Sequence, residues 1–150
     1  FEIAATKTFG FLGEAFEGTG LSVNYTFADS ETANENVNTG ALLPLEDLSE
    51  ESYNVVAFYE NNTFSTRLAY NWRSEFLDVT ANLINEPVYT KASGQLDLSI
   101  SYNITKKIKL TFNGINLTDT YREQYISIPE RQGITSLTGR RYNLGISVKL

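Results

Sequence analysis

Four side chains between residues 121 and 131 combine aromatic rings with guanidinium groups, a combination that suits ligand binding. A ring can stack on a sugar, and a guanidinium donates directed hydrogen bonds to hydroxyls or to an anionic chelate. A catalytic role is not expected, because the sequence has no Cys and no His and its hydroxyl groups therefore lack an imidazole to activate them. For the same reason we expect no metal centre, and we expect no cofactor. The four candidate ligand contacts are Tyr121, Arg122, Tyr125 and Arg131.

Alternation of apolar and polar residues recurs along the whole chain and predicts the strands that would position these side chains. In FSTRLAYNWRSEFL (64–77) the even positions are mostly apolar or aromatic, whereas the odd positions are polar or basic. Successive side chains of a strand point to opposite faces, so this segment has one apolar and one polar side. No stretch has a helical period, and the chain is therefore expected to be all-β. The seven predicted strands cover residues 1–9, 20–28, 52–60, 64–77, 95–104, 108–116 and 141–150.

The connections between these strands alternate in length. Asn61-Asn62 and Thr105-Lys106-Lys107 are tight turns with residues suited to hairpins. Long connections lie at about residues 29–51, 76–93 and 119–139. In an up-and-down meander every second connection lies at the same end, so one end has tight turns and the other has long loops. Outer-membrane barrels have this asymmetry.

The composition of the two faces indicates which one meets lipid. The polar face is mostly Ser, Thr, Asn and Gln, rather than the Lys and Glu that keep a soluble surface hydrated. The apolar face of the best strands carries no charge over about nine to eleven residues, the length of a membrane-crossing strand. A charge there would cost about 2–4 kcal/mol at the midplane. We therefore predict an antiparallel up-and-down transmembrane β-barrel with its polar face toward the lumen.

This alternation assigns individual residues to the two faces. Lumen-facing side chains would either line a solute path or brace the lumen wall, and aromatic side chains on the other face would form a girdle at the membrane surface. The residues expected to face the lumen are Arg67, Asn71, Arg73 and Asp97. The residues expected in the membrane girdle are Phe64, Tyr70, Trp72, Tyr102 and Tyr142.

The strand count and the ends of the sequence predict a part of a larger barrel. Seven strands cannot close a bacterial barrel, which needs an even number. The sequence contains no Met, which indicates a processed form or an internal piece, and its last predicted strand ends at residue 150. We therefore expect residues 1–150 to be the C-terminal part of the barrel. Nucleic acid is not an expected partner, because the net charge is −6 and the basic residues form no patch.

Several segments resemble the late barrel strands of TonB-dependent outer-membrane receptors, and the resemblance covers nearly the whole chain in the family's order. It is closest to the subgroup first recognised in Xanthomonas and Caulobacter. The most specific pieces are Tyr59-Glu60, LAYNWRSEF, Gln95 with Asp97, NLTD (116–119), and Gly139-Arg140 with Tyr142 and Gly145. The longer matching segments are GTGLSVNYTFADSE (18–31), EDLSEESYNVVAFYENNTFSTRLAYNWRSEFL (46–77), GQLDLSISYNITKKIKLTFNGINLTD (94–119) and GRRYNLGISVKL (139–150).

The resemblance implies a barrel of about 22 strands occluded by an N-terminal plug. Such receptors take up scarce nutrients, such as ferric siderophores or carbohydrates, with energy passed through TonB, which would contact the plug missing from this chain. It also implies outer-membrane lipid as surroundings, a small nutrient ligand, and recognition of the C-terminal strand by the barrel-assembly machinery. The chain ends in Leu150, where the family usually ends in an aromatic residue.

Two other classes of protein remain open from the sequence. A small soluble or eight-stranded barrel would hold one apolar ligand inside, with its apolar residues facing inward. An outer-membrane barrel without transport would have the same lipid-facing surface but no plug. The odd strand number and the long loops at one end argue against the first of these.

Overall fold

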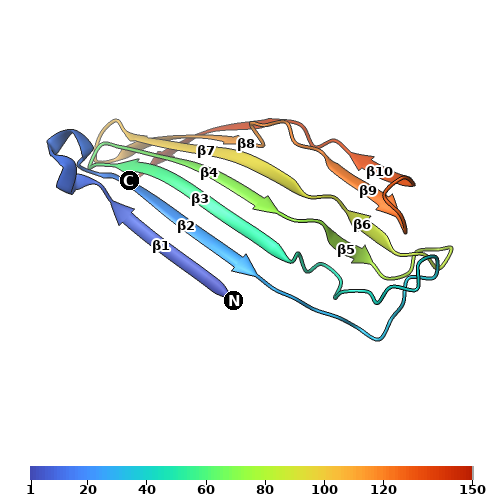
Figure 1. The fold of residues 1–150 in the computed structure, drawn as a ribbon. Helices are drawn as coiled ribbons and strands as arrows, with labels where there is room; N and C mark the ends of the chain where they lie inside the picture. The colour runs from blue at the N-terminus through green and yellow to red at the C-terminus, as the bar shows by residue number, and fades with distance from the viewer. Residues whose placement is uncertain (150) are drawn as a thin grey trace.

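Seven long antiparallel strands form one twisted, open sheet (Figure 1) in this computed structural model, which describes residues 1–149. Each strand pairs with the next long strand along the chain, so the topology is the predicted up-and-down meander. Leu150, the last residue of the predicted closing strand, lies outside the described residues. The seven strands are β1 (Glu2–Thr8), β2 (Thr19–Phe27), β3 (Glu51–Glu60), β4 (Phe64–Arg73), β7 (Ser93–Asn103), β8 (Ile108–Ile115) and β11 (Arg141–Val148).

The two tight turns lie at the same end of the sheet, as predicted (Figure 1). In the first turn the Asn61 Oδ1 atom accepts hydrogen bonds from the backbone N–H groups of Thr63 at 2.9 Å and Phe64 at 2.7 Å. In the second, the Thr105 hydroxyl accepts from Lys107 at 3.2 Å and Ile108 at 3.1 Å. Short polar side chains therefore reverse the chain at both hairpins. The connection from β1 to β2 at this end contains two short 3-10 helices, η1 (Gly10–Leu12) and η2 (Glu14–Phe16).

The sequence predicted only long loops at the other end and missed the short strands that two of these connections contain. The connections 74–92 and 119–139 contribute four short strands to a second sheet in the order β10-β9-β6-β5, whereas residues 29–50 contain an isolated bridge between Glu35 and Leu42. The predicted strand 64–77 is also wrong at its end, because β4 stops at Arg73 and a separate strand begins at Phe76. The short strands are β5 (Phe76–Val79), β6 (Val88–Thr90), β9 (Arg122–Ile126) and β10 (Gln132–Ser136). We call residues 29–50, 74–92 and 119–139 together the loop unit.

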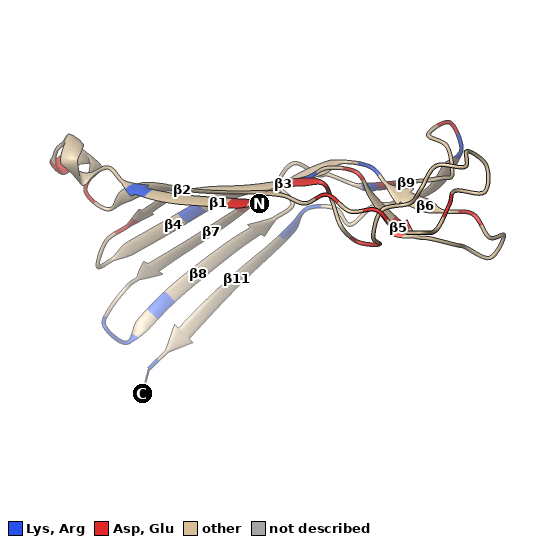
Figure 2. Ribbon diagram, turned by 60° about the horizontal axis from the view of Figure 1, so that its bottom comes forward, with Lys and Arg blue, Asp and Glu red and all other residues tan. Residues whose placement is uncertain are grey.

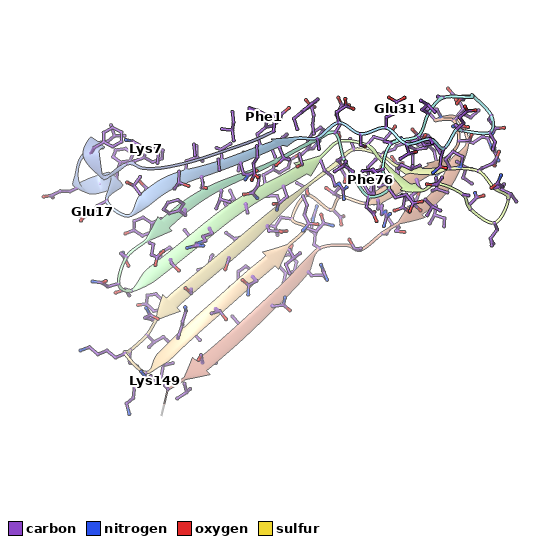
Figure 3. All side chains as sticks on the ribbon, turned by 90° about the horizontal axis from the view of Figure 1, so that it is seen from below. Phe1, Lys7, Glu17, Glu31, Phe76 and Lys149 are labelled. Carbon is purple, nitrogen blue, oxygen red and sulfur yellow. The ribbon has the colours of Figure 1, made fainter. Side chains whose placement is uncertain are left out.

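The hydrophobic core lies in the loop unit rather than in the long sheet. Within residues 1–149 the buried hydrophobic side chains are Leu43, Phe76, Leu77 and Tyr125, and all four belong to this unit. Figure 3 shows Phe76 inside the cluster of side chains beyond the ends of the long strands. Acidic residues also occur frequently along this unit (Figure 2). No helix in the described part of the chain is long and apolar enough to cross a membrane.

Candidate functional site

The strand register determines which side chains share a face of the long sheet. Directly paired residues of neighbouring strands point to the same side, as Phe64 and Tyr102 do. One face carries the predicted girdle residues, and the other carries the predicted lumen residues; that the first of these faces meets lipid stays a prediction. The girdle face carries Phe64, Tyr70, Trp72, Tyr102 and Tyr142. The opposite face carries Arg67, Asn71, Arg73 and Asp97.

Aromatic rings on the girdle face pack against one another near the loop end of the sheet. The rings of Tyr53 and Trp72 are stacked, with their centroids 5.1 Å apart, and Tyr70 lies 6.1 Å from Tyr53. Such pairs contribute about 0.5–1.5 kcal/mol beyond their buried area. Gly94 lies beneath this cluster, where a Cβ atom would come within 2.1 Å of the Tyr70 hydroxyl. The absence of a side chain at Gly94 on β7 thus leaves room for the Tyr70 ring of the neighbouring strand β4.

The opposite face carries two rows of polar side chains that cross four strands, and Arg73 is the one charged member of these rows. Each residue lies directly opposite the next, so the side chains of one row are neighbours on β2, β3, β4 and β7. Within the first row the Asn54 amide donates a hydrogen bond to Asn71. The first row consists of Asn24, Asn54, Asn71 and Gln95. The second row consists of Thr26, Ser52, Arg73 and Ser93.

These two rows form the floor of a cavity of about 800 Å³ at the loop end of the sheet, which we call the vestibule. Its rim comes from two parts of the loop unit, residues 47–49 and 120–122, together with Thr138. This volume lies within the range of about 300–1,000 Å³ that small-molecule sites occupy. The floor offers amide and hydroxyl groups that both donate and accept hydrogen bonds.

Arg73, one of the cations in the vestibule lining, is bound to the protein itself. Its Nε atom donates to the Ser49 hydroxyl at 2.7 Å, and its Nη2 atom donates to the Asp47 carbonyl at 2.7 Å. The guanidinium carbon also lies 3.7 Å from the centroid of the Phe76 ring. Arg73 therefore fastens the rim segment 47–49 to the end of β4.

Arg122 is the second cation of the lining, and it too has partners within the loop unit. Its Nη2 atom contacts a carboxylate oxygen of Asp78 and donates to the Thr90 hydroxyl at 3.1 Å. The other Asp78 oxygen accepts a hydrogen bond from Gln124 at 2.7 Å. The guanidinium is thus paired with a carboxylate across two strands of the small sheet, and its charge is neutralised there.

Tyr125 lies inside the loop unit, with 5% of its surface exposed. Its ring is stacked on Tyr89 at a centroid distance of 5.0 Å, and its hydroxyl donates to Glu75 at 2.5 Å. Burial raises the pKa of the Tyr125 hydroxyl, and the carboxylate of Glu75 raises this pKa further. The phenol therefore stays protonated and serves as a donor within the unit.

Arg131 joins two of the long connections through Glu86. Its Nη1 atom lies 2.6 Å from a Glu86 carboxylate oxygen, which also accepts from Asn38 at 2.6 Å. These donors, Arg131 first, lower the pKa of the Glu86 carboxyl below its ordinary value. Asn38 also donates to the Ser127 hydroxyl at 2.7 Å, so all three parts of the loop unit meet here.

Among the four predicted ligand contacts, Tyr121 is the one whose side chain is exposed at the vestibule without a hydrogen-bond partner in the described part of the chain. It is 48% exposed and belongs to the vestibule lining. The two remaining lumen-face residues lie outside the lining. Arg67 is 3.7 Å from Glu60 in an exposed ion pair, and Asp97 accepts from the Gln95 amide at 2.7 Å.

The sequence analysis missed the first polar row, which we call the amide row, and the core of the loop unit. The strand pattern could have revealed the amide row. Asn24, Asn54, Asn71 and Gln95 all occupy the polar positions of predicted strands, and the tight turn between β3 and β4 fixes part of their register. The residues 1–149 hold no cluster of acidic side chains that could bind a metal ion.

The strand order, the two unlike faces and the vestibule at the loop end define this chain as a segment of an up-and-down β-barrel. The family model described as "TonB dependent receptor-like, beta-barrel" matches residues 1–117, and the chain belongs to this family. Members of this family are outer-membrane receptors and transporters rather than enzymes.

A solved structure with the same fold is the siderophore receptor PiuA from Acinetobacter baumannii. The two chains are 17% identical, with a TM-score of 0.63 over 91% of this chain and 20% of that chain. This chain therefore spans a fifth of the receptor that it resembles. A comparison with curated proteins found no match.

Proposed function

We propose that this chain is the C-terminal part of the barrel of a TonB-dependent outer-membrane receptor that takes up a scarce nutrient. The observation that carries the proposal is the vestibule, a polar cavity at the loop end of a sheet that belongs to this receptor family. In the proposed receptor, the plug and the TonB contact lie in another part of the protein, outer-membrane lipid surrounds the girdle face, and the barrel-assembly machinery reads the C-terminal strand. Resemblance in segments such as LAYNWRSEF supports the Xanthomonas and Caulobacter subgroup.

The vestibule favours a neutral, polyhydroxylated ligand, which means a carbohydrate. Its floor presents amides and hydroxyls, which match the donors and acceptors of a sugar. Arg122 is already paired with the Asp78 carboxylate, which neutralises its charge, and two donors of Arg73 are taken by the Ser49 hydroxyl and the Asp47 backbone carbonyl, so few guanidinium donors remain for an anionic chelate. A ferric siderophore is the second candidate, and the fold similarity to a siderophore receptor supports it.

Tyr121 is the side chain that we assign to ligand contact. Its exposed ring at the rim can stack on a sugar above the amide row. The contacts of Arg122, Tyr125 and Arg131 favour a different role, in which these residues hold the loop unit in shape. Asn71 is assigned to the floor of the solute path, whereas Arg73 holds the rim.

The test uses the full-length receptor that carries this chain, purified in detergent. Its intact mass is measured first, and we expect a mass several-fold above the 16.8 kDa of these residues. Calorimetric titration then compares neutral maltooligosaccharides with a ferric hydroxamate. We expect binding of the oligosaccharide and a loss of about tenfold in affinity for Tyr121→Ala, the equivalent of one good contact.

Tyr102→Ala provides the matched control, because Tyr102 is 46% exposed, close to the 48% of Tyr121, but lies at the other end of the sheet. The affinity of the Tyr102→Ala receptor for the oligosaccharide should equal that of the wild type. Binding of the ferric chelate alone would favour the second candidate. A receptor whose affinity for every ligand tested is the same in Tyr121→Ala would rule out the proposed contact.

A further inference from the structure

Asn116, the first residue of the NLTD motif, is buried at the point where the last long connection leaves the sheet. It is 1% exposed, directly follows β8, and has a backbone φ of 58°. That left-handed conformation is uncommon outside glycine, but Asn tolerates it better than most residues. A buried amide requires hydrogen-bond partners, and the partners of Asn116 define what it does.

The Asn116 side chain joins the two ends of the connection 119–139. Its Oδ1 atom accepts from the Thr120 backbone N–H at 2.8 Å, and its Nδ2 atom donates to the Thr120 carbonyl at 2.8 Å. The same Nδ2 group also donates to the Gly139 carbonyl at 3.3 Å and lies 3.4 Å from the Thr138 hydroxyl. One amide therefore joins Thr120 and Gly139, which lie nineteen residues apart along the chain. We call this point, where the two ends of the connection meet, the neck.

The neck is fastened to β7 by two more contacts. The Thr120 hydroxyl donates to the Gly94 carbonyl of β7 at 2.5 Å. On the lumen face, the Asp97 carboxylate accepts from the Asn116 backbone N–H at 2.9 Å and from the Gln95 amide at 2.7 Å. Gln95 is the last member of the amide row, so the floor and the neck share one hydrogen-bonded network.

We infer that Asn116 is a positioning residue for ligand recognition, which acts by fixing Tyr121 at the vestibule rim. Tyr121 directly follows Thr120, whose backbone N–H, carbonyl and hydroxyl are all held by this network. The Tyr121 side chain has no hydrogen-bond partner of its own in the described part of the chain, so its place at the rim depends on that backbone. The inference rests on the proposed function, because it assumes that Tyr121 contacts the ligand.

Asn116→Gly is the decisive variant, and Asp119→Gly is its matched control. Glycine keeps the left-handed backbone at either position, where φ is 58° and 56°, and removes a side chain. Asp119 is exposed, whereas the Asn116 amide makes the contacts that close the neck. Any difference between the two variants therefore reports the amide itself. Asn116→Asp, which keeps the acceptor oxygen but loses the Nδ2 donor, serves if the glycine variant does not fold.

The first measurement is backbone hydrogen exchange of the receptor without ligand. Asn116→Gly should speed the exchange of peptides that cover residues 121–124 by about tenfold or more, the effect of losing at least one net hydrogen bond of about 1.4 kcal/mol. Asp119→Gly should leave it unchanged. Equal exchange rates in the two variants would overturn the inference whether or not the receptor binds carbohydrate.

The second measurement is oligosaccharide affinity in a double-mutant cycle with Tyr121→Ala. If Asn116 acts through Tyr121, each single variant loses about tenfold and the double variant loses no more than the larger single loss. Losses that multiply in the double variant would show a separate, purely structural role and would overturn the inference. Failure of the wild-type receptor to bind oligosaccharide, with the exchange difference still present, would count against the carbohydrate function and leave the positioning role of Asn116 supported.

Discussion

Replacing Leu77 with alanine is expected to open the loop unit while leaving the long sheet intact. Leu77 is 0% exposed, the most deeply buried of the four hydrophobic side chains in this unit. It lies opposite Tyr89 in the small sheet, and its carbonyl accepts a hydrogen bond from the Asp47 backbone N–H at 2.7 Å. The backbone of Leu77 thus joins two of the three long connections, and its side chain is part of the buried core between them.

The size of the effect follows from this burial. A buried Leu→Ala change costs about 2–5 kcal/mol, which includes the cavity that remains. A value of about 3 kcal/mol corresponds to a change of roughly 100-fold in the opening equilibrium. The loop unit has four buried hydrophobic side chains, so few other buried apolar contacts could compensate for the loss of one.

The measurement is hydrogen exchange of the detergent-solubilised receptor, compared with Leu83→Ala. Leu83 is 105% exposed, so the same chemical change there should alter stability by less than about 0.5 kcal/mol. We expect peptides of β6 and β9 to exchange roughly 100-fold faster in Leu77→Ala only. Peptides of β3 and β4 should keep their wild-type rates in both variants.

Two results would refute this reasoning. Equal protection of β6 and β9 in the two variants would mean that the buried cluster does not stabilise the loop unit. Faster exchange of β3 and β4 to the same extent as β6 and β9 would mean that the unit and the long sheet open together, so that the unit has no stability of its own.

Three further outcomes are expected from the contacts described above. The pKa of the Glu86 carboxyl is lowered from its ordinary 4.5, chiefly by Arg131. The ionised carboxylate therefore stabilises the loop unit above pH 4.5, and this stabilisation is lost as the pH falls from 4.5 through the lowered pKa of the folded state. The near-ultraviolet circular dichroism of the wild type should change over this acidic range, and that of Glu86→Gln should not. Arg73→Lys should release the rim segment 47–49, because one ammonium group cannot replace both directed N–H hydrogen bonds and the guanidinium that stacks on Phe76. Limited proteolysis should then cleave within residues 29–50 faster than in the wild type. Gly18→Ala should lower the unfolding temperature, measured by gel mobility, more than Gly40→Ala does, because both have positive φ but only at Gly18 would the new Cβ meet a backbone carbonyl oxygen, at 2.2 Å.

The long strands could be predicted because their signal is local. Alternation over about ten residues and a hairpin at residues 61–62 are enough to place Phe64 and Tyr102 on one face and Arg67 on the other. The end of β4 was missed for a physical reason. Phe76 and Leu77 are consecutive and both buried, because the loop unit covers both sides of β5, and an alternating pattern assumes one wet side.

The loop unit depends on contacts that no local pattern carries. Asn36 and Ser127 are hydrogen-bonded although 91 residues separate them. Arg122 and Arg131 were grouped as ligand contacts from their types, whereas their acidic partners, Asp78 and Glu86, lie 44 and 45 residues away. The sequence could identify residues able to bind an anion, but only the fold shows that these guanidinium groups already have carboxylate partners.

The long sheet contributes no buried hydrophobic side chain among residues 1–149, so the loop unit depends on a core of its own. A neutral sugar is bound by hydrogen bonds that each contribute about 0.5–1.5 kcal/mol net, so ordering a mobile rim on binding would remove much of that gain. Under the proposed function, Leu77 and its neighbours order the rim before the ligand arrives, and Asn116 fixes the residue before Tyr121. Leu77→Ala should therefore weaken oligosaccharide binding without touching a ligand contact. If affinity stayed at the wild-type value while β6 and β9 lost protection, the rim would be shown to bind without being ordered in advance.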